Sequence, residues 1–206
     1  MKLTWYGHSC FLAETAEGSA VFDPYAPGSV PGLRLPPLTA DAVLCSHSHR
    51  DHGYAQGVTL RGKGLRAKVT RIPCFHDEAG GAKRGDNLIT VLEAEGLRLA
   101  HLGDLGHMLS PEQLSALGRV DILLIPVGGY YTIDAHTAWA LTEAIRPGIT
   151  VPMHYRGAGY GYDVIGPVED FLAHAEKVVR LDGSVLEPET LEKPAVVLLR
   201  CPVAGE

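Results

Sequence analysis

The chain has 206 residues, of which 46% are hydrophobic and 20% are charged, as in ordinary globular proteins. Its 18 Lys and Arg residues against 24 Asp and Glu residues give a net charge of −6, with no long run of either sign, so no nucleic-acid partner is expected. The N-terminus lacks the basic and apolar blocks of a signal peptide, and no apolar run reaches the length of a membrane span. We therefore expect a cytoplasmic protein without a membrane span.

Short apolar or alternating runs predict that strands dominate the chain. The predicted strands cover residues 2–6, 10–15, 19–23, 42–46, 67–74, 88–94, 97–102, 121–126, 149–153 and 196–200, with a further short strand at 178–181. Glu95-Gly96 joins two of these runs and predicts a tight hairpin turn.

Three helices are predicted in the second half of the chain, and a short turn of helix is predicted at 51–57. Ser110-Pro111-Glu112-Gln113 is a capping box with proline at the first helical position, so a helix is expected to Leu117. Asp134 is expected to cap a helix that ends at Ile145, and a third helix is predicted over 167–177. Paired strands early and strand–helix alternation later predict an α/β (α+β) fold, in a single domain of residues 1–206.

The hexapeptide His47-Ser48-His49-Arg50-Asp51-His52 places three histidines and an aspartate in six positions. Three further candidate ligands, His76, Asp104 and His154, each follow a predicted buried strand. Side chains at strand ends are held by a rigid scaffold, and sites form there for that reason. Each of the three would be unremarkable alone, but together with the hexapeptide they predict a metal site.

The spacing of the hexapeptide suits two ions better than one. His47 and His49 are two residues apart, so they point to the same side of an extended chain, whereas the adjacent Asp51 and His52 point differently. We expect a first set of His47, His49 and His76, a second set of Asp51, His52 and His154, and Asp104 between them. Imidazole and carboxylate ligands suit two divalent ions, zinc first, with manganese or iron as the alternatives.

The hexapeptide matches the H-x-H-x-D-H signature of the metallo-β-lactamase superfamily, which this chain resembles over essentially its whole length. The isolated His76, the Gly103-Asp104 pair and the Met153-His154 pair resemble the remaining ligand motifs of that superfamily, in the same order. The stretches WYGHSCF, GGYYTID and VPMHY look like a subgroup of small hydrolases that includes ascorbate-phosphate lactonases and many uncharacterised members. The resemblance implies a four-layer αβ/βα sandwich with two mixed β-sheets.

This sequence lacks features that characterise other branches of the superfamily, and these differences reduce the number of branches that it resembles. The best-known β-lactamases carry a cysteine at the position of Asp104, and flavodiiron proteins carry a carboxylate at the position of His49. The RNA-processing nucleases need an exosite arm or a large inserted domain, and glyoxalase II needs a C-terminal helical domain. This chain has none of these features in its sequence, so a small-molecule substrate is expected.

The expected chemistry is hydrolysis of an ester, lactone or phosphodiester by a hydroxide that two metal ions activate. Asp51 would be both a ligand and the acceptor of the proton of the attacking water, and Asp104 would bridge the ions. Two alternatives stay open. One is a mononuclear iron oxygenase of the persulfide dioxygenase type, and the other is a non-catalytic metal-binding protein. The sequence leaves the oligomeric state open, including a homo-oligomer.

Candidate substrate contacts are His8, Tyr130, Tyr131 and Arg156. His8 is equally well explained as a histidine satisfied within a turn, and the tyrosines as packing for Gly-rich loops. Lys83-Arg84 is a weaker candidate for binding an anion, and Asp23 is expected to orient loop backbone or a ligand histidine. For His107 and His136 a structural role is favoured.

Overall fold

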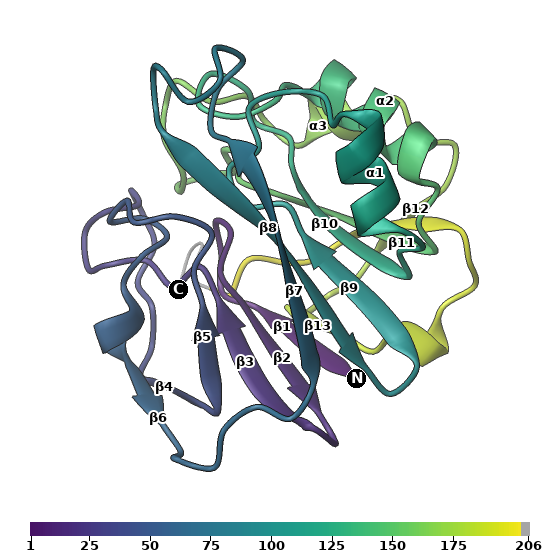
Figure 1. Cartoon of the computed structure of the whole chain (residues 1–206). Coiled ribbons are helices and arrows are strands. Elements are labelled where there is room, and N and C mark those ends of the chain that lie inside the picture. The colour runs from purple at the N-terminus through teal and green to yellow at the C-terminus, as the bar shows by residue number, and fades with distance from the viewer. Residues whose placement is uncertain (203–206) are drawn as a thin grey trace.

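The computed structural model describes residues 1–202 and consists mainly of two mixed β-sheets packed face to face (Figure 1). Residues 203–206, the end of the expected domain, lie outside the described part. A five-stranded sheet has the order β13-β1-β2-β3-β5, and a seven-stranded sheet has the order β12-β14-β11-β10-β9-β8-β7. The two mixed sheets and the mixture of strands and helices confirm the expected fold class.

The five-stranded sheet comes mostly from the first 44 residues. It contains β1 (Lys2–Trp5), β2 (Phe11–Thr15), β3 (Gly18–Phe22), β5 (Ala42–Leu44) and β13 (Val185–Leu186). The pairs are antiparallel except for β3 with β5. A small separate pair, β4 (Leu38–Ala40) with β6 (Val58–Leu60), lies beside it, with the short 3-10 helix η1 (Ala55–Gly57) before β6.

The seven-stranded sheet is antiparallel at one edge and parallel elsewhere. Its strands are β7 (Lys68–Phe75), β8 (Asp86–Ala94), β9 (Leu97–His101), β10 (Ile122–Pro126), β11 (Ile149–Met153), β12 (Val178–Arg180) and β14 (Ala195–Leu198). The predicted turn between β8 and β9 is confirmed, because Glu95 and Gly96 both have positive φ, as a type I′ hairpin requires.

The core lies between the two sheets. The ring of Phe22 on β3 stacks on His101 of β9, with 5.3 Å between ring centroids, and Phe11 of β2 meets the same imidazole edge-on. His101 is itself satisfied, since Nε2 donates to the carbonyl of Ser9 at 2.9 Å and Nδ1 accepts from the Gly103 N–H at 3.1 Å. This histidine therefore joins the sheets and is not available as a ligand.

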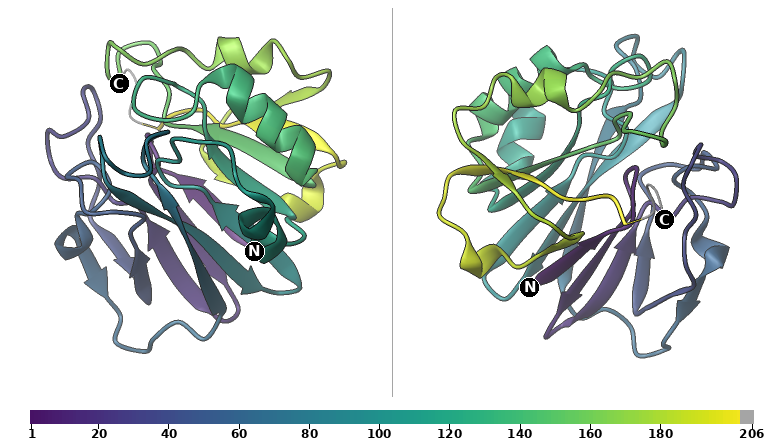
Figure 2. Two further views of the ribbon diagram at one scale, coloured as in Figure 1. Left: turned by 45° about the horizontal axis from the view of Figure 1, so that its top comes forward. Right: turned by 180° about the vertical axis from the view of Figure 1, so that it is seen from behind.

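Three α-helices lie on the outer side of the seven-stranded sheet (Figures 1 and 2). α1 (Pro111–Leu117) begins at the predicted capping box of Ser110 and Gln113, and α2 (Ala135–Ile145) begins at Asp134, whose side chain accepts from the Thr137 N–H. α3 (Glu169–Leu172) is shorter than predicted. Hydrogen bonds from His174 to Phe171 and from Ala175 to Leu172 tighten the chain there, so that it can enter β12.

Every strand that the sequence predicts is present, within about two residues at each end. The structure adds β4, β6 and β13, which have two or three residues each, and a second 3-10 helix, η2 (Pro188–Thr190). Within residues 1–202, no helix has the length and apolar character that a membrane crossing requires.

Candidate metal centre

The loops that follow five strands meet at one end of the sandwich. His8 follows β1, His47 to His52 follow β5, His76 follows β7, Asp104 follows β9 and His154 follows β11. Because these strands are aligned within the two sheets, their C-terminal ends bring together side chains that are distant in sequence. The predicted ligands therefore come from both sheets.

Asp104 lies at the centre of this group. Its Oδ2 is 3.2 Å from Nε2 of His52, 3.1 Å from that of His76, 3.4 Å from that of His154 and 3.9 Å from that of His47. The Asp104 carboxylate is buried, and it faces histidines of both predicted sets. This is the placement that a bridging ligand needs.

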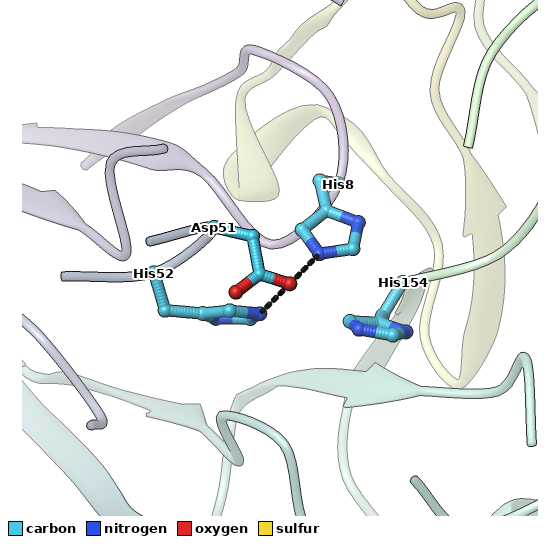
Figure 3. A group of neighbouring side chains, drawn as sticks. All are labelled: His8, Asp51, His52 and His154. Atoms are coloured by element: carbon cyan, nitrogen blue, oxygen red, sulfur yellow. Dashed lines mark ion pairs between the residues drawn. The ribbon is translucent and has the colours of Figure 1, made fainter. Parts of the chain in front are cut away.

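Candidate ligand atoms fall into three groups, each within 4.8 Å. One group contains His47, His49 and His76, which is the first predicted set. The second contains His8, Asp51, His52 and His154, so it adds His8 to the second predicted set (Figure 3). The third, His47, His52 and Asp104, joins the other two.

Hydrogen bonds at Nδ1 fix the orientation of three imidazoles. His52 Nδ1 donates to Asp23 Oδ2 at 2.8 Å, and His76 Nδ1 donates to the Tyr131 carbonyl at 3.2 Å. His47 Nδ1 donates to Ser46 Oγ at 2.9 Å, because the Ser46 hydroxyl itself donates to Asp23. Each ring then directs Nε2, the nitrogen that a metal ligand would use, towards Asp104.

Asp23 and Asn87 support the ligands from behind. Asp23 accepts from the Ser46 N–H and from the Ser46 hydroxyl, both at 2.6 Å, besides its contact with His52. This placement agrees with the orienting role expected for Asp23. Asn87, which the sequence did not single out, accepts from the Asp104 N–H at 3.0 Å and donates to the Leu102 carbonyl at 2.9 Å. Its only sequence signal is an amide next to an apolar strand.

The charges favour a cation beside Asp104. Burial lowers the pKa of His52 and His76, but the Asp104 carboxylate outweighs it and raises both above the ordinary value. Burial raises the pKa of Asp104, but His154 and His52 hold it well below the ordinary range. Burial also lowers the pKa of His47 to about 4, so this ring is neutral at pH 7. The centre thus stabilises positive charge around an ionised carboxylate.

Several buried polar atoms of this cluster have no hydrogen-bond partner in the described part of the chain. They are Nδ1 and Nε2 of His8, Nε2 of His47, Nε2 of His52, Oδ1 of Asp104, and Nδ1 and Nε2 of His154. Buried polar atoms without partners are rare and costly, and clusters of them need an explanation. Divalent metal ions fit this donor set, because nitrogen and carboxylate oxygen are the ligands they take.

A cleft of about 560 Å³ opens onto the centre. It is lined by His49, Asp51, His76, Lys83, Arg84, Gly85, Asp104, Tyr131 and Tyr162. The Tyr162 hydroxyl lies 3.1 Å from Asp51 Oδ2 and 2.7 Å from the Ser29 carbonyl. Arg84 donates to the Tyr130 carbonyl at 2.8 Å, and its guanidinium lies over the Tyr131 ring.

The predicted substrate contacts are not all in this cleft. Tyr131 lines it, whereas the exposed Tyr130 contributes only its carbonyl to Arg84. Arg156 lines a separate cavity of about 610 Å³ with Tyr155, Tyr160 and Arg200. Lys83 and Arg84, the weaker candidates, both line the cleft.

The remaining histidines are accounted for by packing and turn contacts. His107 accepts from the Phe75 N–H through Nε2 at 3.1 Å. The ring of His136 meets His174, which stacks on Trp139 of α2. These contacts agree with the structural roles favoured for His107 and His136.

Comparisons with known proteins agree with this architecture. Residues 2–154 match the model of the β-lactamase superfamily domain. The chain is 30% identical over 190 residues to a UPF0173 protein of Pyrococcus abyssi, covering 78% of this chain and 86% of the relative. It is 28% identical over 190 residues to a UPF0173 metal-dependent hydrolase of Thermoplasma acidophilum, covering 75% and 83%.

Among solved structures, the chain is similar to a protein of Thermotoga maritima from the metallo-β-lactamase superfamily, for which a zinc-dependent hydrolase activity has been suggested. The TM-score is 0.78, with 33% identity over 96% of this chain and 98% of the other. The resemblance predicted from the ligand motifs is confirmed. The chain belongs to the metallo-β-lactamase superfamily, within its UPF0173 group of metal-dependent hydrolases.

Proposed function

We propose that the chain is a dinuclear metal hydrolase that acts on an anionic small molecule with an ester, lactone or phosphodiester bond. The observation that carries this proposal is the position of Asp104 Oδ2, within 4 Å of Nε2 of histidines from both predicted sets. His47, His49 and His76 would hold one ion, Asp51, His52 and His154 the other, and Asp104 both. The ions would supply Lewis acidity and an activated water, zinc being the first candidate and manganese or iron the alternatives.

Asp51 is the residue placed to accept a proton. Burial raises its pKa, but His8 and His52 outweigh this effect and hold the pKa well below its ordinary value, so the carboxylate is ionised. It lines the cleft, and the Tyr162 hydroxyl lies against its Oδ2. A carboxylate held in this way can orient a water and take its proton.

Arg84 favours an anionic substrate, with Lys83, which pairs with Glu78, beside it. Both cations line the cleft. The carboxylates that line it, Asp51 and Asp104, are candidate metal ligands, so bound metal would offset their negative charge. Arg84 uses one nitrogen for the Tyr130 carbonyl, which leaves further N–H donors of its guanidinium for a carboxylate or phosphate. Tyr131 and Tyr162 add two aromatic walls with hydroxyl groups.

The test is a hydrolysis panel of lactones, phosphodiesters, thioesters and β-lactams with protein loaded with zinc or manganese. Asp51→Ala should lower turnover at least about 100-fold on whichever substrate is cleaved, because proton transfer contributes about that much. Metal content is measured on the same sample, and Asp182→Ala, an exposed aspartate, is the matched control. Undiminished turnover with metal retained would remove Asp51 from the mechanism. One iron per chain without hydrolysis would favour the oxygenase alternative.

A further inference from the structure

His8 is held in an unusual backbone position beside the metal centre. Gly7 and His8 both have positive φ, at 92° and 51°, within a turn closed by hydrogen bonds between Tyr6 and Cys10 and between Cys10 and Gly7. The His8 carbonyl accepts from the Trp5 indole at 3.0 Å and from the His154 N–H at 3.3 Å. A non-glycine residue rarely adopts this conformation, and such positions cluster at functional sites.

The turn directs the imidazole of His8 inwards. The side chain is fully buried, and neither ring nitrogen has a hydrogen-bond partner among the described residues. Nε2 lies 3.5 Å from Asp51 Oδ2, and the ring centroid lies 4.1 Å from that of His154 and 5.0 Å from that of His52. Figure 3 shows these rings and the Asp51 carboxylate facing one another.

We propose that His8 is an additional ligand of the second metal ion, beside Asp51, His52 and His154. The four ligand atoms lie within 4.8 Å of one another. Two donors that share an ion at about 2.0–2.2 Å can be up to about 4.4 Å apart, so a small rotation of the rings brings all four within reach of one ion. The proposal rests on the two-metal centre of the proposed function and extends its second set.

The other roles open to His8 fit these contacts less well. A histidine that only completes a turn would use a ring nitrogen in a hydrogen bond, and His8 uses neither. A substrate contact would be exposed to the cleft, whereas the side chain of His8 has no exposed surface and is absent from the cleft lining. Coordination of a metal ion is the role that uses a buried imidazole whose nitrogens make no hydrogen bond.

With His8 as a ligand, the two ions would differ in the number and burial of their ligands. The first set offers three imidazoles, one of them the exposed His49. The second set with His8 offers three imidazoles and the Asp51 carboxylate, with His8, His52 and His154 all fully buried. Since donor number and burial both strengthen retention of an ion, the second ion should be released last during chelation.

NMR of the imidazole nitrogens tests whether His8 binds metal in the wild-type protein. Protein labelled with ¹⁵N-histidine is titrated with zinc, and His8→Gln serves only to assign the His8 signals. We expect one ring nitrogen of His8 to move to the position of a zinc-bound nitrogen as the second ion binds. Unchanged His8 signals at full zinc loading would overturn the proposal.

Metal affinity gives a second measurement. In chelator competition, His8→Gln should lower the affinity for one ion at least about 100-fold and leave the affinity for the other unchanged. Loss of a residue that only supports a ligand already lowers metal affinity about 10–100-fold. His136→Gln, outside the centre, is the matched control. If the wild-type chain retains a single ion, the two-metal proposal fails. His8 is then a ligand of that one ion if its ring-nitrogen NMR signal shifts when the ion binds, and it is not a ligand if the signal stays unchanged.

Discussion

Asp23 and Asp41 receive the same pair of hydrogen bonds but face different neighbours. Asp23 accepts from the backbone and hydroxyl of Ser46, and Asp41 accepts from the backbone and hydroxyl of Ser19. Asp23 also holds His52, whereas Asp41 lies near Arg61. Comparing substitutions of Asp23 and Asp41 therefore separates two contributions to metal affinity: that of a carboxylate that holds a histidine, and that of a carboxylate that only supports a loop.

Asp23→Asn should weaken metal binding about 10–100-fold, because the amide keeps the shape but removes the charge that fixes the His52 tautomer. The measurement is chelator competition on zinc-loaded protein. Asp41→Asn is the control and should retain wild-type affinity. Equal affinities for all three proteins would show that His52 is oriented without Asp23.

Arg84→Ala should raise KM for an anionic substrate about 10–100-fold with a smaller effect on kcat, because a charge-assisted hydrogen bond to the substrate is lost. Steady-state kinetics on an anionic and a neutral substrate of the same reacting bond provide the measurement. Arg66→Ala is the control, since Arg66 also donates to a backbone carbonyl, that of Ala16. An equal rise for the neutral substrate would exclude charge recognition by Arg84.

The positions of the predicted metal ligands could be read from the sequence because their spacing is local or follows recognisable strands. The placement of Lys83, Arg84 and Arg156 could not. Arg156 is two residues after His154, yet a loop that turns back through Gly157 and Tyr160 takes it to a different cavity. Proximity in sequence says little about direction once the chain leaves a strand.

At the scale of elements, the loop between β7 and β8 is organised by one carboxylate. Asp77 accepts four backbone N–H bonds, from Ala79 and Gly81 to Oδ1 and from Lys83 and Arg84 to Oδ2, at 2.7–3.0 Å. His76 immediately precedes it. The same loop therefore carries a candidate ligand and both cations of the cleft, and its shape depends on an ionised aspartate.

Acid should loosen this loop. Burial raises the pKa of Asp77, but the four N–H donors outweigh it and lower the pKa to about 2. Because the folded pKa lies below the ordinary value, this stabilisation is complete above about pH 4 and is lost as the pH falls towards 2. Hydrogen exchange of the four donor amides is the measurement.

The same four amides should lose protection at pH 7 in Asp77→Asn. Asp134→Asn, at the start of α2, should change exchange only in that helix. Protection that is unaffected by either acid or Asp77→Asn would mean that the loop is held by other contacts.

Elements with strong local signals were predictable, and those without were not. The capping box of α1 and the Asp134 cap of α2 fix helix starts within a few residues. β4, β6 and β13 lie outside the apolar runs that mark the equally short β5 and β12, and their pairing is decided by distant partners. α3 was predicted too long because the need to enter β12 at Val178 ends the helix early.

At the scale of the whole molecule, the candidate ligands join the two sheets. His8 and the hexapeptide extend from strands of the five-stranded sheet, and His76, Asp104 and His154 extend from strands of the seven-stranded sheet. Ions held at this end would connect the sheets, with the Phe22–His101 stack connecting them in the core. Metal binding and the stability of the sandwich should be coupled.

Removal of metal should lower the melting temperature. At free metal about 1,000-fold above Kd, each ion contributes about 4 kcal/mol, which corresponds to roughly 8–16 °C for a chain of this size. Calorimetry of chelator-treated and metal-loaded protein provides the comparison, and restoration of the transition by added zinc is the control. Equal transitions with metal uptake verified would show that the sheets are held without the ions.

The fold class followed from the motif resemblance more than from the strand pattern. Alternating runs identify strands, but the order β12-β14-β11-β10-β9-β8-β7 depends on contacts between residues far apart in the chain. The assignment of strands to two opposed sheets, and the direction of each ligand within the centre, are consequences of that order. Neither can be derived from local spacing.

The order of the ligands along the chain has a consequence for synthesis. The first set is complete once residue 76 has been made, whereas the second set, with His8 included, waits for residue 154. Asp104 appears between these two points. Because β7, which positions His76, pairs with β8 further along the chain, the first three histidines come together only when the sheets assemble, and a centre with both sets would form only after residue 154 has been made.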